Sequence, residues 1–172
     1  MPGKIAWGFS LFCDDIRGEI GGKLSVMGIY QSDMIFPPTQ TFPFNMPKFC
    51  VLIKYYENLN TFTDDIAIRV FLPGDASDSP TVVLPFPRAS LGQPDFSYAL
   101  EEDQERIFNL SFPLVLSPCL IKQEGFIKVR AICGTTTTRL GSLRIRKAQA
   151  DENLQWFMPP QVPTNIPAQP NA

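Results

Sequence analysis

The sequence contains no histidine. Without imidazole the chain lacks the base of Ser-His-Asp and Cys-His catalysis, the commonest metal ligand and the usual proton shuttle near neutral pH. It also has no glycine-rich GxxxxGK[ST] or GxGxxG loop with which to cradle a phosphate. Most hydrolase and nucleotide-binding scaffolds are therefore unsupported. We predict that the protein is not an enzyme.

Long apolar runs are also missing. No window approaches the roughly 18 uninterrupted apolar residues of a membrane span, and the N-terminus lacks the small-residue cleavage site of a signal peptide. The formal net charge is -2, from 15 basic and 17 acidic residues, so nothing draws the whole chain towards nucleic acid or anionic membranes. We expect a cytoplasmic protein that binds neither membranes nor nucleic acid.

Cysteine is sparse, and its spacing does not suit a metal. The four cysteines are Cys13, Cys50, Cys119 and Cys133, which form no CxxC pair and have no histidine to complete a zinc site. Each lies in or beside an apolar stretch, where a reduced thiol behaves as a small hydrophobic side chain. The sequence predicts four buried free thiols. It predicts no cofactor, although calcium is considered below.

Alternation of apolar and polar residues recurs along the chain and predicts strands. In the first strand, Trp7 and Phe9 fall on one face and the small Gly8 and Ser10 on the other. Eight strands are expected, at 5–13, 24–30, 48–57, 65–73, 81–86, 106–117, 125–133 and 139–147.

No segment has a convincing amphipathic helix, so the predicted fold is an all-β, antiparallel two-sheet sandwich, immunoglobulin-like or C2-like, over residues 1–147. A barrel is the alternative. Pro85 indicates an edge strand, and Pro113 indicates an edge or a bulge.

Acidic residues follow the first and third predicted strands. If every connection reverses the chain, these two turns emerge at one end and bring Asp14, Asp15, Asp64 and Asp65 together. Convergent carboxylates are what Ca²⁺ prefers, so a calcium- or carbohydrate-binding module is one hypothesis. The simpler alternative is that Asp14 and Asp15 end the first strand and organise its turn, with Arg17 as an ion-pair partner. A carboxylate-based hydrolase is a third hypothesis, but no facing carboxyl pair is evident.

Two proline-rich segments contain aromatic residues. The arm, residues 31–47, contains Phe36, Phe42 and Phe44, and the tail, residues 148–172, contains Trp156 and Phe157. The same reversal argument brings the arm and the end of the last strand to one end of the fold. The aromatics either close the core within one chain, which we favour, or face a protein partner or a second copy. From about residue 159 we expect an extended or disordered tail.

Basic residues crowd the last predicted hairpin, which contains Lys128, Arg130, Arg144 and Arg146. Their alternation with Ile127, Val129, Leu143 and Ile145 is typical of a solvated face, and an anion- or nucleic-acid-binding patch is the alternative. The chain lacks the catalytic and phosphate-binding motifs considered above and has an apolar arm and tail. Together these features favour a non-catalytic binding or assembly module.

The run Cys13-Asp14-Asp15-Ile16-Arg17, followed by Glu19, Gly22, Lys23, Ser25, Gly28 and Tyr30, resembles the start of a family of uncharacterised bacterial proteins with the signature CDDIRxExxGKxSxxGxY. The resemblance implies a bacterial or bacteriophage source and a cytosolic location. It implies no catalytic or binding residue.

Overall fold

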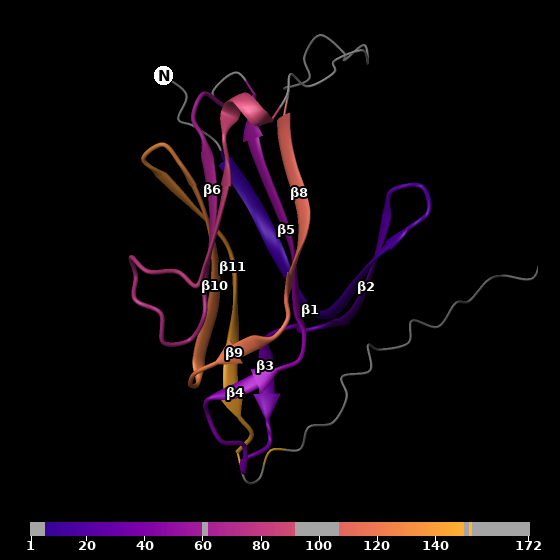
Figure 1. The fold of residues 1–172 in the computed structure, drawn as a ribbon, viewed down its shortest axis with the longest axis vertical. Coiled ribbons are helices and arrows are strands. Elements are labelled where there is room, and N and C mark those ends of the chain that lie inside the picture. The colour runs from indigo at the N-terminus through magenta and orange to yellow at the C-terminus, as the bar shows by residue number, and fades with distance from the viewer. Residues whose placement is uncertain (1–5, 60–61, 92–106, 150–151, 153–172) are drawn as a thin grey trace, which may run out of the picture.

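The computed structural model of the protein describes residues 6–59, 62–91, 107–149 and 152. These residues form strands, apart from loops and one 3-10 turn at Arg88–Ser90 (Figure 1). The strands are β1 (Ala6–Glu19), β2 (Lys23–Ile29), β3 (Asp33–Phe36), β4 (Phe44–Met46), β5 (Phe49–Asn58), β6 (Ile66–Phe71), β7 (Val82–Phe86), β8 (Ile107–Leu116), β9 (Cys119–Ile121), β10 (Gly125–Cys133) and β11 (Thr136–Lys147).

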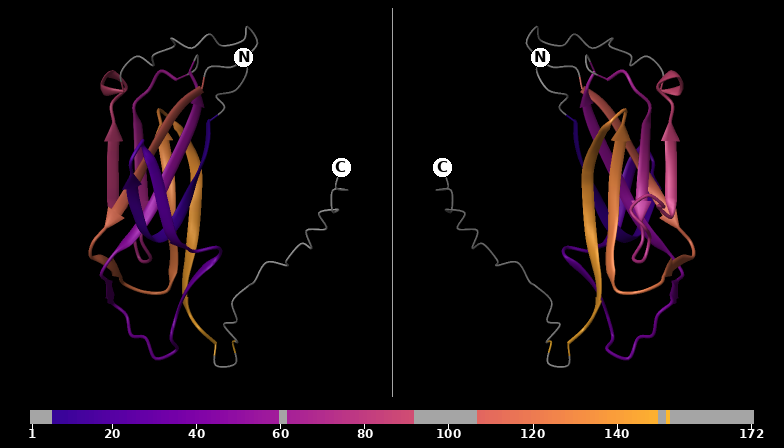
Figure 2. Two further views of the ribbon diagram at one scale, coloured as in Figure 1. Left: turned by 90° about the vertical axis from the view of Figure 1, so that its right-hand side faces the viewer. Right: turned by 90° about the vertical axis from the view of Figure 1, so that its left-hand side faces the viewer.

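Two larger sheets make up the body of the molecule. The first, sheet A, has the strand order β2-β1-β5-β8, and the second, sheet B, has the order β3-β11-β10-β6-β7. A small third sheet pairs β4 with β9. The inward side chains of both larger sheets belong to one hydrophobic core, and the views from the side show the sheets facing each other (Figure 2). The all-β fold is consistent with a β-sandwich.

Period-two burial explains how the sheets pack. In β10, Ile127, Val129 and Ala131 are buried while the residues between them face outward. The sheets come closest where β1 crosses β11. A Cβ atom at Gly8 would lie 2.2 Å from the Lys54 carbonyl oxygen and 2.7 Å from Leu140 Cδ2, so only glycine fits between the two sheets there.

Several sequence predictions are confirmed. Each of the eight predicted strands has a counterpart, and the described ranges contain no α-helix. Pro85 lies in β7 and Pro113 in β8, each of which is an edge strand. All four cysteines are buried and free.

The prediction of a wholly antiparallel chain is wrong, because β3 pairs with β11 in the parallel direction. The arm supplies β3 and β4, which are too short for their alternation to be recognised. The arm is therefore not a single reversing connection, and β5 runs antiparallel to β1 with Ala6 opposite Glu57. The turn after β1 and the loop after β5 therefore lie at opposite ends of the sheet.

Glu152, in the chain after β11, is paired with Arg146 of β11. Arg146 donates from both terminal nitrogens to the two carboxylate oxygens of Glu152, each at 2.6 Å, and its Nε donates to Asp33. The rest of the predicted tail, 150–151 and 153–172, lies outside the described residues. In the described part of the chain, no helix is long and apolar enough to cross a membrane.

Candidate functional site

The outward side of β1, β5 and β8 forms a continuous surface that we call the apolar face. Cross-strand register places Trp7 opposite Tyr56 and Tyr56 opposite Asn109. The face consists of Trp7, Phe9, Leu11, Leu52, Lys54, Tyr56, Ile107, Asn109, Ser111, Pro113 and Val115. Lys54 is the single charged residue in this set.

Large apolar side chains on this face are exposed to a degree unusual for a soluble domain. The exposed fraction is 48% for Trp7, 41% for Phe9 and 48% for Val115. Trp7 stacks on Tyr56 with ring centroids 4.1 Å apart, so the two rings present one flat aromatic surface. Rigid, amphipathic aromatic rings of this kind are typical of protein interfaces.

The β1–β2 hairpin adjoins the apolar face and extends away from the two-sheet body (Figure 1), and it carries the charged residues Asp15 and Arg17 as well as exposed apolar ones. Met27 and Ile29 lie opposite Asp15 and Cys13, respectively, and both are exposed on β2. Ile20, in the turn of the hairpin, is 98% exposed. The hairpin therefore carries apolar side chains that the rest of the described chain does not cover.

Trp7 and Phe9 reverse the usual expectation for an alternating strand. Their size and alternation suggest the core side of β1, yet the small residues Gly8 and Ser10 face inward. The close crossing of β1 and β11 leaves no room there for a large side chain. The sequence did contain a signal for an outward apolar face, because β1 has bulky residues on one side and glycine on the other, and the side with glycine can approach a facing sheet most closely.

The signature residues hold the hairpin together. Tyr30 Oη donates to Asp14 Oδ1 at 2.5 Å. Gly28 has φ of +67°, and a Cβ there would lie 2.1 Å from Asp14 Oδ2, so glycine makes room for this carboxylate. Burial, and then the bond to Asp14, raises the pKa of Tyr30 above its usual value. Asp14 is thus a structural acceptor within the hairpin.

Asp15 is held by two cations. It accepts from Lys48 Nζ and, at 2.8 Å, from Arg17 Nε, and these bonds lower its pKa to about 2. The predicted pairing of Arg17 is confirmed. The prediction that Asp14 and Asp15 end the first strand is wrong, because β1 continues to Glu19, where Ser25 Oγ donates to the carboxylate at 2.8 Å.

The four predicted calcium ligands do not share an end. Asp64 and Asp65 lie in the loop after β5, at the opposite end of sheet A from Asp14 and Asp15. Asp65 instead accepts a 2.8 Å bond from the backbone N–H of Arg88. Within the described residues, no three Asp, Glu or Cys side chains are grouped closely enough to hold a metal ion. The shared-end prediction is wrong, and the calcium hypothesis loses its geometric basis.

The aromatics of the arm pack on one another. Phe36 lies edge-on to Phe42 and Phe44, with centroid distances of 5.9 and 5.4 Å, and all three rings are half-buried. The backbone N–H of Ala148 donates to the Phe36 carbonyl at 2.8 Å, and Lys147 Nζ lies over the Phe42 ring. The arm therefore meets the end of the last strand, as predicted. Trp156 and Phe157 lie outside the described residues.

Comparison of the chain with protein-family models, with curated proteins and with solved structures finds no match. The resemblance of the hairpin to a bacterial signature stays a prediction. The functional argument therefore depends on the surfaces described above.

Proposed function

We propose that this chain is a non-catalytic binding and assembly protein of the cytoplasm that self-associates through its apolar face. The observation that carries the proposal is the exposure of Trp7, Phe9 and Val115 on a sheet face whose single charge is Lys54. Removing exposed apolar surface from water contributes roughly 25 cal/mol per Å², and Trp7, Phe9 and Val115 remain exposed around the buried Leu52.

A second copy of the chain suits this face better than a charged partner does. In a two-fold dimer the same patch lies on both sides, so it must be complementary to itself. An apolar face with one lysine meets that condition, because its flat aromatic surface packs on another flat surface and few like charges are brought together. Sheet faces of this kind pack about 10 Å apart, as the sheets of a sandwich do.

Pairing through sheet edges is less favourable. Pro113 lies in the edge strand β8 and Pro85 in the edge strand β7, and proline removes a backbone donor from an edge. Both prolines discourage the addition of a further strand. At these two edges, association of faces is favoured over association of edges.

The strand order supports an immunoglobulin-like form of the sandwich. Strands β1, β5 and β8 of sheet A correspond to A, B and E, and strands β11, β10, β6 and β7 of sheet B to G, F, C and C′. In this scheme the apolar face is the outer side of the A-B-E sheet. The arm and the tail, with Trp156 and Phe157, would close the end of the core where Phe36, Phe42 and Phe44 pack.

Sedimentation velocity of the full chain tests the proposal with a matched pair of variants. Phe9→Ser removes an aromatic ring from the apolar face, and Phe126→Ser removes a comparably exposed ring, 48% against 41%, from the outer side of sheet B. We expect the wild type and Phe126→Ser to be dimers and Phe9→Ser to be a monomer. A monomeric wild type, or equal behaviour of the two variants, contradicts the proposal.

A further inference from the structure

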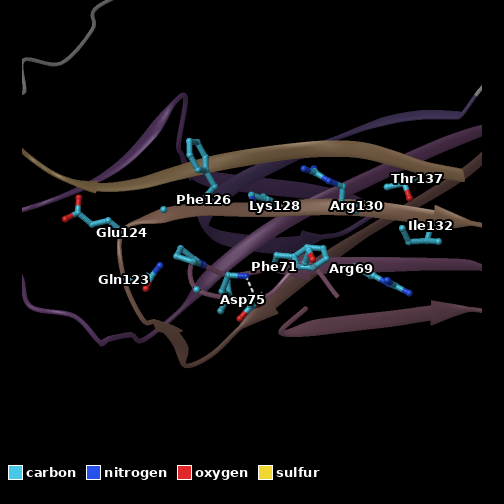
Figure 3. Close-up of a pocket in the computed structure, with 15 residues that line it drawn as sticks. Arg69, Phe71, Asp75, Gln123, Glu124, Phe126, Lys128, Arg130, Ile132 and Thr137 are labelled. Atoms are coloured by element: carbon cyan, nitrogen blue, oxygen red, sulfur yellow. Dashed lines mark hydrogen bonds between the residues drawn. The ribbon is translucent and has the colours of Figure 1, made fainter. Parts of the chain in front are cut away.

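The outer side of sheet B carries a groove that the proposed assembly does not use. It follows β10, whose outward residues Phe126, Lys128, Arg130 and Ile132 form its floor, and has a volume of about 580 Å³ (Figure 3). The loop at Leu72–Ser77 and the residues just before β10 form one end. This volume lies in the range of small-molecule sites.

Three arginines lie in one row across this side of the sheet. Arg130 on β10 is directly opposite Arg69 on β6 and directly opposite Arg139 on β11. Neighbouring strands are about 4.8 Å apart, so three residues of like charge occupy adjacent positions in the sheet, although the Arg69 and Arg130 side chains point away from each other (Figure 3). Like charges directly opposite each other destabilise strand pairing. The row concentrates positive charge on this side of the sheet, and an anion lying over it would offset that charge.

The cations of the groove are not neutralised by the described carboxylates. Within the described residues, no carboxylate pairs with Arg69, Lys128 or Arg130, and the buried Nε of Arg69 has no hydrogen-bond acceptor. Among the described residues, Arg130 donates to the neighbouring Val129 carbonyl, at 3.0 Å. Figure 3 shows the Arg69 and Arg130 side chains pointing away from each other. Burial, and then the charge of Arg139, lower the pKa of Arg130.

The two carboxylates at the end of the groove have other partners. Asp75 accepts from the backbone N–H groups of Leu72 and Thr81, at 2.9 and 2.8 Å, and from the Thr81 hydroxyl (Figure 3 shows the Leu72 bond). Burial raises the pKa of Asp75, but these bonds outweigh it and the net pKa is lowered. Glu124 accepts from the backbone N–H of Lys147 at 3.0 Å. Neither carboxylate neutralises the arginine row.

We propose that this groove binds a small phosphorylated anion, with Arg69 and Arg130 as its principal ligands and Lys128 as a third. Guanidinium groups donate two parallel hydrogen bonds to phosphate, and an anion over the row relieves the repulsion within it. Phe126, next to Lys128 on the outward side of β10, offers an apolar surface to an organic part of the ligand.

A small ligand fits the groove better than a nucleic-acid strand does. A strand needs a continuous positive track with stacking platforms along it. Here the positive stretch ends at Asp75 and Glu124, whose negative charges would repel the next phosphates. The groove therefore matches one or two phosphate groups.

Titration calorimetry of the full chain with pyrophosphate at low salt tests this proposal, with inorganic phosphate as a second probe. We expect one site per chain. Because a hydrogen bond to a charged group contributes about 1.5–3 kcal/mol, Arg130→Gln or Arg69→Gln should weaken binding about tenfold or more. The control is Arg144→Gln, which removes the same charge from the same hairpin but lines a different hollow, beside Asp33 and Glu152. It should change the affinity by less than about twofold.

A second readout keeps the test valid if one variant folds poorly. Pyrophosphate should raise the melting temperature of the wild type more than that of Arg130→Gln at the same concentration, while Arg130→Gln without ligand should melt above the wild type because one of three adjacent positive charges is removed. Absence of binding by the wild type, or equal weakening by Arg144→Gln, overturns the proposal. Displacement of pyrophosphate by a single-stranded oligonucleotide, with a salt dependence of several charges, overturns the choice of a small ligand.

This inference is independent of the self-association proposal. Phe9→Ser should bind pyrophosphate as the wild type does, and Arg130→Gln should remain a dimer. Failure of one proposal is therefore distinguishable from failure of the other.

Discussion

The outer faces of the two sheets differ in chemistry although both are built by the same alternation. On sheet A the outward positions carry Trp7, Phe9 and Val115 with one lysine, whereas on sheet B they carry Arg69, Lys128 and Arg130. The inward positions of both sheets are apolar and fill a common core. The core thus specifies the fold, and the outward residues are free to differ because burial does not constrain them. One face suits association with an apolar surface and the other suits an anion.

The largest expected effect on stability comes from disrupting the close packing at Gly8, where β1 of sheet A meets β11 of sheet B. In Gly8→Ala the new Cβ overlaps the Lys54 carbonyl of the neighbouring strand β5 and Leu140 of the facing strand β11, so the backbone of β1 must shift against both. We expect the free energy of unfolding to fall by about 2–3 kcal/mol in urea denaturation. Gly18→Ala is the matched control in the same strand, since nothing lies within 4 Å of its Cβ position, and should change stability by less than about 0.5 kcal/mol. Equal effects would show that the sheets do not meet at Gly8.

Alkaline pH should weaken sheet A before it affects the arginine row. Burial, and then the charge of Cys50, raise the pKa of Cys13 from 9.0 to about 11, and burial raises that of Cys50. The unfolded chain loses these protons first, so stability is fully present below pH 9.0 and falls as the pH rises towards 11.

The melting temperature measured from neutral pH upward checks this, and it should fall by several degrees. Cys13→Ala should make the decline shallower, since one raised pKa is removed. A melting temperature that stays constant to pH 11 would contradict the burial of this thiol.

Added salt should have different effects on self-association through the apolar face and on pyrophosphate binding at the arginine row. Burial of the apolar face is hydrophobic and should be unchanged or strengthened by added sodium chloride. Pyrophosphate binding to the arginine row is electrostatic and should weaken several-fold over the same range, because salt screens the charges. Sedimentation and calorimetry across one salt series give both results. The same direction of change for both would indicate that the two surfaces are not chemically distinct.

Much of the fold is predictable because the long strands repeat one pattern. Burial alternates with a period of two through β6 and β10, and Pro85 and Pro113 mark edge strands correctly. The short strand β3 escapes this reasoning, since four residues beside prolines carry too little alternation. Because the arm was predicted as a single connection, the direction inferred for β5 was reversed and Asp64 and Asp65 were misplaced.

The two candidate surfaces depend on information that alternation does not carry. Arg69 and Arg130 are opposite each other only because β6 pairs with β10 in one register, and the two strands are far apart in the sequence. For the apolar face, alternation places Trp7 and Phe9 together but does not say which side is inward. The crossing of β1 and β11 at Gly8 decides that.

The smallest expected effect on stability concerns the aromatic residues of the tail and the phenylalanine cluster of the arm. If Trp156 and Phe157 cover the cluster of Phe36, Phe42 and Phe44, the double variant Trp156→Ser, Phe157→Ser should lower the free energy of unfolding by about 1–2 kcal/mol. It should leave both self-association and pyrophosphate binding unchanged. Loss of the dimer in this variant would move the association surface from sheet A to the arm and tail.

Fluorescence of Trp7 tests most directly whether the apolar face is buried by a second copy. The chain has two tryptophans, so Trp156→Phe leaves Trp7 as the single reporter. In an isolated chain Trp7 is 48% exposed. We expect its emission to lie at short wavelength in concentrated solution and to shift to longer wavelength on dilution, with the midpoint that sedimentation gives for the dimer. Emission typical of exposed tryptophan at every concentration would contradict self-association through this face.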